Sequence, residues 1–367
     1  MKKIKVGIIL SGLGYIERGN EVAFTEYIKR LVKKEDLEIF VFGSGKNFKV
    51  KNVRYIRIPC LMRHWFNRHI KIKRLHLTHN HDYENLFFSI LIIPWLLKYK
   101  LDVILFSSFP FTLLPLKIYS KFRNKKVKIV FNPGGGTAFF YSRFFSADAI
   151  AATDPISQQF FSKRFNSVCI PAGVDIDIFK PQKISRKEFN LPEDKFIIFS
   201  SSALDPIKRL DFLIKAVSKI KNAYLVFSST GVQEKYLKKL GKELLGENIR
   251  FLGMVNQFDL VKYYSSADVF CLPSKIEPFG LVLVEAMACQ TPVVTNNTDI
   301  QKWIVKDGGS CVDVSDMDTL VKALEKYKDK ELAEEIGKKG RKNVQERFSW
   351  DTAAEKYYKL FKELINK

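Results

Sequence analysis

Two glutamates and a glycine stand close together within residues 274–297, in an arrangement that could bind a phosphorylated sugar. Glu277 lies in a loop that ends at Gly280, and Glu285 lies in the early turns of the apolar helical run that follows. A helix N-terminus offers free N–H groups and a partial positive charge, and a glycine there lets a phosphate approach the backbone. A carboxylate can accept hydrogen bonds from two adjacent hydroxyl groups. The stretch therefore fits a nucleotide-sugar, with its diphosphate at the helix start and one glutamate on each sugar.

Taken alone, a glutamate before a helix also fits an ordinary cap or a solvated charge. The longer string distinguishes these interpretations, because the pattern E-P-F-G-x-x-x-x-E-A-M-A runs unbroken from Glu277 to Ala288. This string resembles the donor-site motif of retaining GT-B glycosyltransferases, in particular family 4 (group 1). The resemblance implies an α/β protein of the GT-B type, with two Rossmann-like doubly wound domains and a cleft between them.

The resemblance also implies roles for individual residues. Glu277 matches the residue that holds the donor sugar hydroxyls, and Glu285 matches the residue on the ribose. Lys208 matches the phosphate-binding lysine of the family, and Val255 matches the position whose backbone holds the base. The candidates are Glu277 and Lys208 for catalysis; Glu285, Arg209, Val255, Phe279, Gly280, Leu281, Gly12 and Gly14 for the donor; and Asn132, Gly134, Gly135 and Gly136 for the cleft or acceptor loop.

Transfer of a sugar from such a donor requires neutralisation of the departing diphosphate. We expect no metal and no cofactor, so fixed cations and N–H dipoles must supply that charge. Arg209, next to Lys208, is a second candidate cation. In the family, attack from the leaving-group face is thought to retain the anomeric configuration, so no carboxylate nucleophile is required.

Two positions depart from the family pattern. Ala203 stands where the family usually has an arginine, five residues before the loop lysine. Asn132 begins a glycine-rich string where the family commonly has a histidine. Three interpretations remain: Arg209 and the N–H groups of the glycine loop substitute, the enzyme is slow, or the chain is a degenerate partner subunit.

The rest of the chain alternates between short apolar runs, typical of buried parallel strands, and amphipathic runs, typical of helices. This order predicts a first Rossmann-like domain on the acceptor side over residues 1–172 and a nucleotide-sugar-binding domain over residues 173–349. The last helix, residues 350–367, is expected to pack back on the first domain.

Two glycine-rich strings follow predicted strands of the first domain. Gly12 and Gly14 do not make a dinucleotide fingerprint, because Glu17 occupies the third glycine position. They instead predict a first loop that faces the cleft. Residues 134–136 follow a predicted strand at 127–131, where open α/β sheets bind ligands, although a flexible loop fits them equally.

The chain has 367 residues, 46% of them hydrophobic, and a formal charge of +22 that implies an anionic partner. The candidates are nucleic acid, an anionic membrane and phosphorylated substrates, but no nucleic-acid-binding module is recognisable. The five cysteines are odd in number and lack a CxxC, which predicts reduced core residues in a cytoplasmic protein. The longest apolar block, residues 86–97, is about half of what a membrane span needs.

Residues 39–81 contain basic and aromatic side chains but no acidic residue before Asp82. This composition fits peripheral adsorption to the inner face of an anionic membrane, and it fits a solvated basic face equally. His79 and His81 lack the carboxylate or cysteine cluster that a metal site needs, apart from Asp82.

The interpretation that covers most of these features is transfer from a UDP- or GDP-sugar to a lipid-linked or surface-polysaccharide acceptor. The alternatives are a GT-B enzyme that acts on a soluble sugar phosphate, an epimerase, and a catalytically degenerate paralogue.

Overall fold

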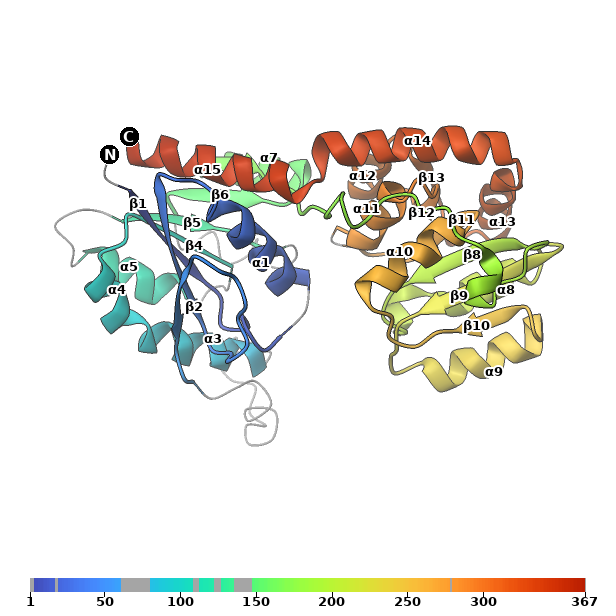
Figure 1. The fold of residues 1–367 in the computed structure, drawn as a ribbon, viewed down its shortest axis with the longest axis horizontal. Coiled ribbons are helices and arrows are strands. Elements are labelled where there is room, and N and C mark those ends of the chain that lie inside the picture. The colour runs from blue at the N-terminus through green and yellow to red at the C-terminus, as the bar shows by residue number, and fades with distance from the viewer. Residues whose placement is uncertain are drawn as a thin grey trace. The chain divides into compact units, whose positions relative to one another are not determined.

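The computed structural model describes residues 3–16, 19–60, 80–107, 112–121, 127–134, 147–277 and 279–366. The chain forms two compact units (Figure 1). Unit 1 contains Met1–Ala172 together with Trp350–Lys367, and unit 2 contains Gly173–Ser349.

Unit 1 is built on a seven-stranded sheet in which every neighbouring pair of strands is parallel, in the order β3-β2-β1-β4-β5-β6-β7. The central strand β4 is buried at all four positions, as expected for a parallel strand that is covered by helices on both faces. The elements are β1 (Ile4–Ile9), α1 (Gly19–Leu31), β2 (Leu37–Gly43), β3 (Arg54–Arg57), α3 (Asn80–Leu91), α4 (Ile93–Tyr99), β4 (Val103–Phe106), α5 (Leu113–Lys121), β5 (Lys128–Phe131), β6 (Ala149–Ala152), α7 (Pro155–Ser162), β7 (Ser167–Cys169) and α15 (Trp350–Asn366).

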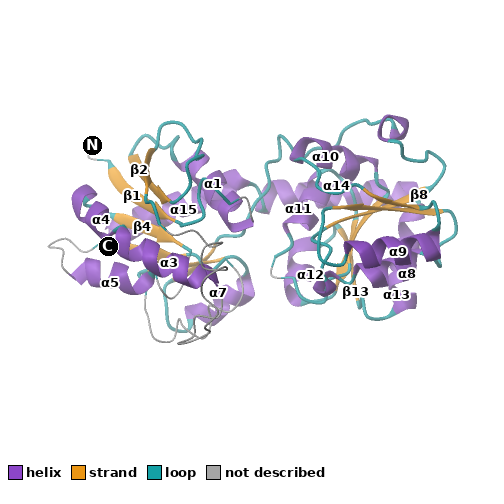
Figure 2. Ribbon diagram, turned by 90° about the horizontal axis from the view of Figure 1, so that it is seen from below, coloured by secondary structure: helices purple, strands orange, loops and turns teal. Residues whose placement is uncertain are grey.

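Helices cover both faces of this sheet. On one face, α3, α4 and α5 place Phe88, Leu96 and Leu116 in a cluster with strand residues such as Phe40 and Phe106. On the other face, α15 packs against α1 (Figure 2). The last helix of the chain is therefore part of the first unit.

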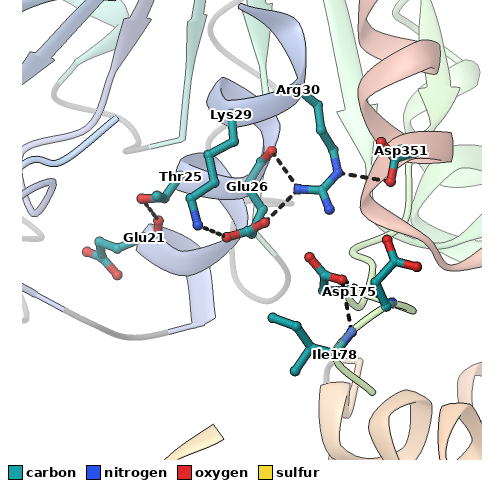
Figure 3. Close-up of polar contacts among 9 residues, drawn as sticks. Glu21, Thr25, Glu26, Lys29, Arg30, Asp175, Ile178 and Asp351 are labelled. Atoms are coloured by element: carbon teal, nitrogen blue, oxygen red, sulfur yellow. Dashed lines mark hydrogen bonds and ion pairs between the residues drawn. The ribbon is translucent and has the colours of Figure 1, made fainter. Parts of the chain in front are cut away.

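The contact between α1 and α15 combines an aromatic core with charged side chains at its rim. The rings of Tyr27 and Trp350 meet edge to face, with centroids 5.5 Å apart. At the rim, Arg30 Nη1 contacts Glu26 Oε2 at 2.6 Å and Arg30 Nε contacts Asp351 Oδ2 at 3.1 Å (Figure 3). Trp350 is 4% exposed whereas the Asp351 side chain is 69% exposed, so the apolar contact should dominate the stability of this packing.

Unit 2 repeats the design with six parallel strands in the order β10-β9-β8-β11-β12-β13. The 3₁₀ turns are η1 (Arg186–Phe189), η2 (Pro206–Lys208) and η3 (Lys326–Lys328). The strands are β8 (Phe196–Ser201), β9 (Ala223–Ser228), β10 (Ile249–Phe251), β11 (Val269–Leu272), β12 (Val293–Asn296) and β13 (Gly309–Val312). The helices are α8 (Leu210–Val217), α9 (Glu234–Leu245), α10 (Gln257–Ser266), α11 (Leu281–Ala288), α12 (Asp299–Val305), α13 (Met317–Glu325) and α14 (Lys330–Arg347).

Helices α8, α9 and α13 cover one face of the second sheet, and α10 and α11 cover the other (Figure 2). Helix α14 packs against α11. This packing requires glycine in α14, because a Cβ at Gly337 would meet the carbonyl oxygen of Gln290 at 2.0 Å. A Cβ at Gly340 would meet the Met287 side chain at 3.2 Å.

Strand β13 is not among the strands predicted above; it ends at Val312 and pairs with β12 through Val293↔Gly309. The apolar block of residues 86–97 is divided between α3 and α4. Within the described part of the chain, no helix is both long enough and apolar enough to cross a membrane.

Replacing Trp350 with alanine should lower the free energy of unfolding by about 3–5 kcal/mol, because it opens a cavity against Tyr27. The matched control, Asp351→Ala, should cost less than about 1 kcal/mol, because an exposed ion pair contributes little. Chemical denaturation of both variants tests this ranking. Equal losses would show that charge, not apolar packing, holds α15 in place.

Candidate functional site

The candidate site of unit 2 lies where strands β8 and β11 end. These strands are neighbours in the sheet and pair through Val269↔Ile198 and Phe270↔Phe199. Because parallel strands end at the same edge, the segments that follow them lie side by side there. One segment carries Lys208 and the other carries Glu277, so the fold joins two residues that are 69 positions apart.

Lys208 and Glu277 form an ion pair in which Nζ lies 2.6 Å from Oε2. The lysine side chain is 19% exposed and the glutamate side chain is 11% exposed. Removing either charge would leave the other poorly solvated. Both groups nevertheless keep some access to solvent, so a ligand with anionic and hydroxyl groups could reach them.

The loop that holds Glu277 leads directly into helix α11. Gly280 stands at the helix N-cap in the left-handed conformation, with φ 81°, and no side chain caps this helix end. A Cβ at Gly280 would lie 3.1 Å from Glu277 Cγ and from Leu283 Cδ1. The glycine therefore allows a tight turn in which the Leu283 N–H donates to the Gly280 carbonyl, and the N–H groups of Leu281 and Val282 remain available to an anion.

Glu285 lies within α11 and accepts a hydrogen bond from the Tyr264 hydroxyl at 2.8 Å. Burial raises the pKa of Glu285 to about 7, although the tyrosine hydrogen bond acts in the opposite direction. Burial also raises the pKa of Tyr264, and the nearby glutamate adds to that increase. Burial therefore favours the protonated form of Glu285, and Tyr264 is the partner that sequence reasoning missed.

Val255 lines a hollow of about 370 Å³ at the edge strand β10. The walls include the aromatic side chains of Phe189 and Tyr263. A hollow bounded by aromatic rings suits a flat ring such as a nucleobase. The position expected to hold the base therefore borders a space of suitable character.

Arg209 and Phe279 are occupied by contacts within unit 2. Arg209 Nη1 donates to the carbonyl oxygen of Val314 at 2.7 Å, and its guanidinium lies 4.3 Å from the centroid of the Phe212 ring. Phe279 is 9% exposed and meets Phe348 edge to face. These contacts fit supporting roles better than direct contact with a ligand.

Two further polar groups lie on the segments that carry the ion pair. The Oγ atoms of Ser202 and Ser274 are buried and have no hydrogen-bond partner within the described structure. Such hydroxyl groups are normally satisfied by a protein group or an ordered water.

Leu281 is the first residue of α11. In the described part of the chain, no three histidine, cysteine or acidic side chains gather as a metal site would require.

In unit 1, the glycines of the first loop serve packing within that unit. A Cβ at Gly12 would meet Glu21 Oε1 at 2.3 Å. Gly14 has φ +83° and lies against the backbone of Gly45, whose N–H donates to the carbonyl of Leu13. The positive φ and the backbone contact explain why Gly14 needs glycine without any ligand, whereas the contact at Gly12 is with the end of a side chain.

Asn132 directly follows strand β5, and both parts of its amide are engaged. Its Nδ2 donates to the Tyr357 hydroxyl at 2.6 Å, and its Oδ1 accepts from the Gly134 N–H at 2.8 Å. Asn132 is 2% exposed, so it fixes the turn after β5 and does not offer a free side chain. The predicted loop residues Gly135 and Gly136 lie outside the described residues.

Comparison with known proteins shows which family this site belongs to. Residues 181–343 match the family "Glycosyl transferases group 1". An uncharacterized glycosyltransferase from Methanocaldococcus jannaschii is 34% identical over 200 residues, which are 52% of this chain and 51% of that protein. A GDP-mannose-dependent monoacylated alpha-(1-6)-phosphatidylinositol monomannoside mannosyltransferase from Corynebacterium glutamicum is 28% identical over 51% of this chain and 54% of its own. The chain spans about half the length of the curated relatives it matches.

Solved structures match over nearly all of the chain. Sucrose-phosphate synthase from Thermosynechococcus elongatus aligns over 100% of both chains, with a TM-score of 0.78 and 21% identity. Anabaena HepE, in complex with UDP and glucose, covers 98% of this chain and 100% of its own, with a TM-score of 0.73 and 17% identity. The chain therefore has the GT-B fold, which confirms the predicted fold class. Within its second unit, residues 181–343 match the group 1 glycosyl transferases, as the motif predicted.

The raised pKa of Glu285 has a consequence for stability that Glu285→Gln should reveal. The folded-state pKa of about 7 exceeds the ordinary value of 4.5, so the folded protein binds more protons between these pH values. The free energy of unfolding should therefore fall as pH rises through that window, by up to roughly 3 kcal/mol. Glu285→Gln should lack this fall. The free energy of unfolding of the variant minus that of the parent should therefore be larger at pH 8 than at pH 5. If the free energies of unfolding of the parent and the variant, measured by chemical denaturation, change in parallel with pH, Glu285 does not have a raised pKa.

Proposed function

We propose that this chain transfers a sugar, with retention of anomeric configuration, from a UDP- or GDP-sugar to a lipid-linked or surface-polysaccharide acceptor. The ion pair between Lys208 and Glu277, beside the uncapped start of α11, is the observation that carries the proposal. One cation, one hydroxyl acceptor and a row of N–H groups converge at one sheet edge. These are the groups that a diphosphate and a sugar ring require.

Donor binding would exchange partners within this pair. The diphosphate would replace the Glu277 carboxylate as the partner of Lys208, and the sugar hydroxyls would replace the ammonium group as the partners of Glu277. Neither charge would then be left without a partner, so the exchange avoids the cost of a lone buried charge. Glu285 would accept from the ribose hydroxyls, and the hollow at Val255 would hold the base.

The chemical step would form a bond between an acceptor oxygen and the anomeric carbon, while the bond from that carbon to the diphosphate oxygen breaks. The departing oxygen takes the electron pair, and its new charge is stabilised by Lys208 and the N–H groups of α11. The acceptor attacks from the face of the leaving group, so its proton can pass to the departing phosphate oxygen. This arrangement retains configuration without a carboxylate nucleophile.

The names of similar proteins support a nucleotide-sugar donor, but they differ in acceptor. The relatives include the GDP-mannose-dependent mannosyltransferase, a probable sucrose-phosphate synthase from Thermosipho melanesiensis and a D-inositol 3-phosphate glycosyltransferase from Mycolicibacterium smegmatis. We favour a lipid-linked or polysaccharide acceptor because the high positive charge suits a protein that works at an anionic surface. Incubation with a panel of UDP- and GDP-sugars, monitored by nucleotide release, tests the class. The absence of release with every donor would favour a degenerate paralogue.

Lys208→Ala should lower the single-turnover rate by about 10²–10³, because it removes a preorganised stabiliser of the departing diphosphate. Binding of the nucleoside part should change much less. The matched control is Lys215→Ala on α8, which removes an exposed lysine whose Nζ lies 3.9 Å from Asp211. A parental rate in Lys208→Ala would place the phosphate site elsewhere. Thermal unfolding of both variants separates catalysis from any destabilisation by the unpaired Glu277.

Nucleotide affinity should weaken as pH falls from 8 to 6. Below the pKa of about 7, Glu285 gains a proton and loses part of its capacity to accept from ribose hydroxyls. Loss of a hydrogen bond to a charged group costs about 1.5–3 kcal/mol, and about a tenth of Glu285 stays ionised at pH 6, so affinity should fall by up to about tenfold. Glu285→Gln should bind weakly at every pH in calorimetric titration. A parental affinity in this variant would remove Glu285 from the site.

A further inference from the structure

The outer surface of helices α3, α4 and α5 in unit 1 carries large apolar side chains. We call this surface the apolar face; it comprises Ile90, Leu91, Trp95, Leu97 and Ile118. Each of these side chains is between 37% and 51% exposed. The three helices contact one another and cover the same face of the sheet (Figure 1).

These side chains are not needed to fill the core of unit 1. The same helices already bury Phe88, Leu96, Leu116 and Tyr119 against the sheet. A surface helix of a globular protein normally has one apolar stripe toward the core and polar residues on its other side. Exposed apolar side chains in addition to that stripe indicate an interaction surface.

Helices α4 and α5 and the residues between them are mainly basic. Residues 93–121 contain four basic residues and one acidic residue, Asp102. The Asp102 carboxylate accepts from the backbone N–H of Lys5 and so is engaged within unit 1. The basic residues are Lys98, Lys100, Lys117 and Lys121.

We propose that the apolar face docks unit 1 onto a bilayer that contains anionic lipid. Aliphatic side chains and a tryptophan suit the boundary between head groups and acyl chains, and lysines suit lipid phosphates. Trp95 and Lys98 show this pairing on α4, where Nζ lies 5.4 Å from the centroid of the indole ring.

Other occupants fit these observations less well. A second copy of the chain would bring another net charge of +22 to the same surface. Nucleic acid would satisfy the lysines, but Ile90, Leu97 and Ile118 can neither stack on bases nor hydrogen-bond to them. A bilayer uses both the apolar and the basic groups.

The proposal differs from the expectation drawn from residues 39–81. Residues 61–79 of that segment lie outside the described structure, and the apolar face is formed by helices that follow it in sequence. Docking by this face does not depend on transferase activity, although it would suit a lipid-linked acceptor.

Co-sedimentation with vesicles tests the proposal on the full chain. One set of vesicles contains phosphatidylcholine alone, and the other contains phosphatidylcholine and phosphatidylglycerol. The parent should bind only the anionic vesicles, and salt should weaken binding. Leu97→Ser should reduce binding about tenfold, because it removes one apolar anchor. The matched control, Leu244→Ser on α9, has a leucine of similar exposure in unit 2 and should bind like the parent.

A second pair of variants tests the charge. Lys98→Gln should weaken binding about fivefold, as expected for one lysine near an anionic surface. Lys239→Gln on α9 removes an exposed lysine from unit 2 and should leave binding unchanged. Parental binding by Leu97→Ser and Lys98→Gln would overturn the proposal, as would equal binding to neutral vesicles.

Two other results would also overturn it. A dimer that Leu97→Ser dissociates in analytical ultracentrifugation would make the face a self-interface. Retention on RNA with no binding to anionic vesicles would identify a nucleic-acid surface. Nucleotide release by Leu97→Ser separates this test from the proposed catalysis, because the variant should keep parental release while it loses vesicle binding. A parent without release on any donor would leave the vesicle result valid by itself.

Discussion

The ion pair between Lys208 and Glu277 sets the main requirement on unit 2, because it needs two segments 69 residues apart to end at one place. Parallel pairing of β8 with β11 meets this requirement: neighbouring strands in such a sheet end at the same edge. The pairing depends on strands that are buried along their whole length, as β8 and β11 are. Core packing therefore decides whether the two charges meet, and the charges add little that would hold the sheet together by themselves.

Much of this arrangement could be predicted from the sequence. Short apolar runs that alternate with amphipathic runs predicted the doubly wound sheets, and the fold class is confirmed. The spacing of Glu277, Gly280 and Glu285 predicted a helix that starts near the glycine, with one carboxylate before the start and one after it. The structure places Gly280 at the N-cap of α11. These predictions succeeded because they depend on local pattern, which one stretch of sequence contains in full.

Other features depend on contacts that local pattern does not record. Helix α14 is polar along most of its length, and its glycines at 337 and 340 argue against a helix unless the partner helix is known. Strand β13 begins with Gly309, a residue that is rare in strands, and it was not predicted for a similar reason. The hydrogen bond from Tyr264 to Glu285 joins two helices, so the raised pKa of that carboxyl group could not be anticipated from its neighbours in sequence.

The replacement of the usual histidine by Asn132 shows how a departure from a family pattern can become part of the structure. An asparagine amide has both a donor and an acceptor, and here the donor reaches Tyr357 on α15 while the acceptor holds the Gly134 N–H. The turn after β5 is thereby tied to the last helix of the chain, which is itself fixed by Trp350 against α1. A histidine at this position could not make both contacts with the same geometry, because its two ring nitrogens point in different directions from an amide's nitrogen and oxygen. Residue 132 therefore fixes the turn that follows β5 through both contacts.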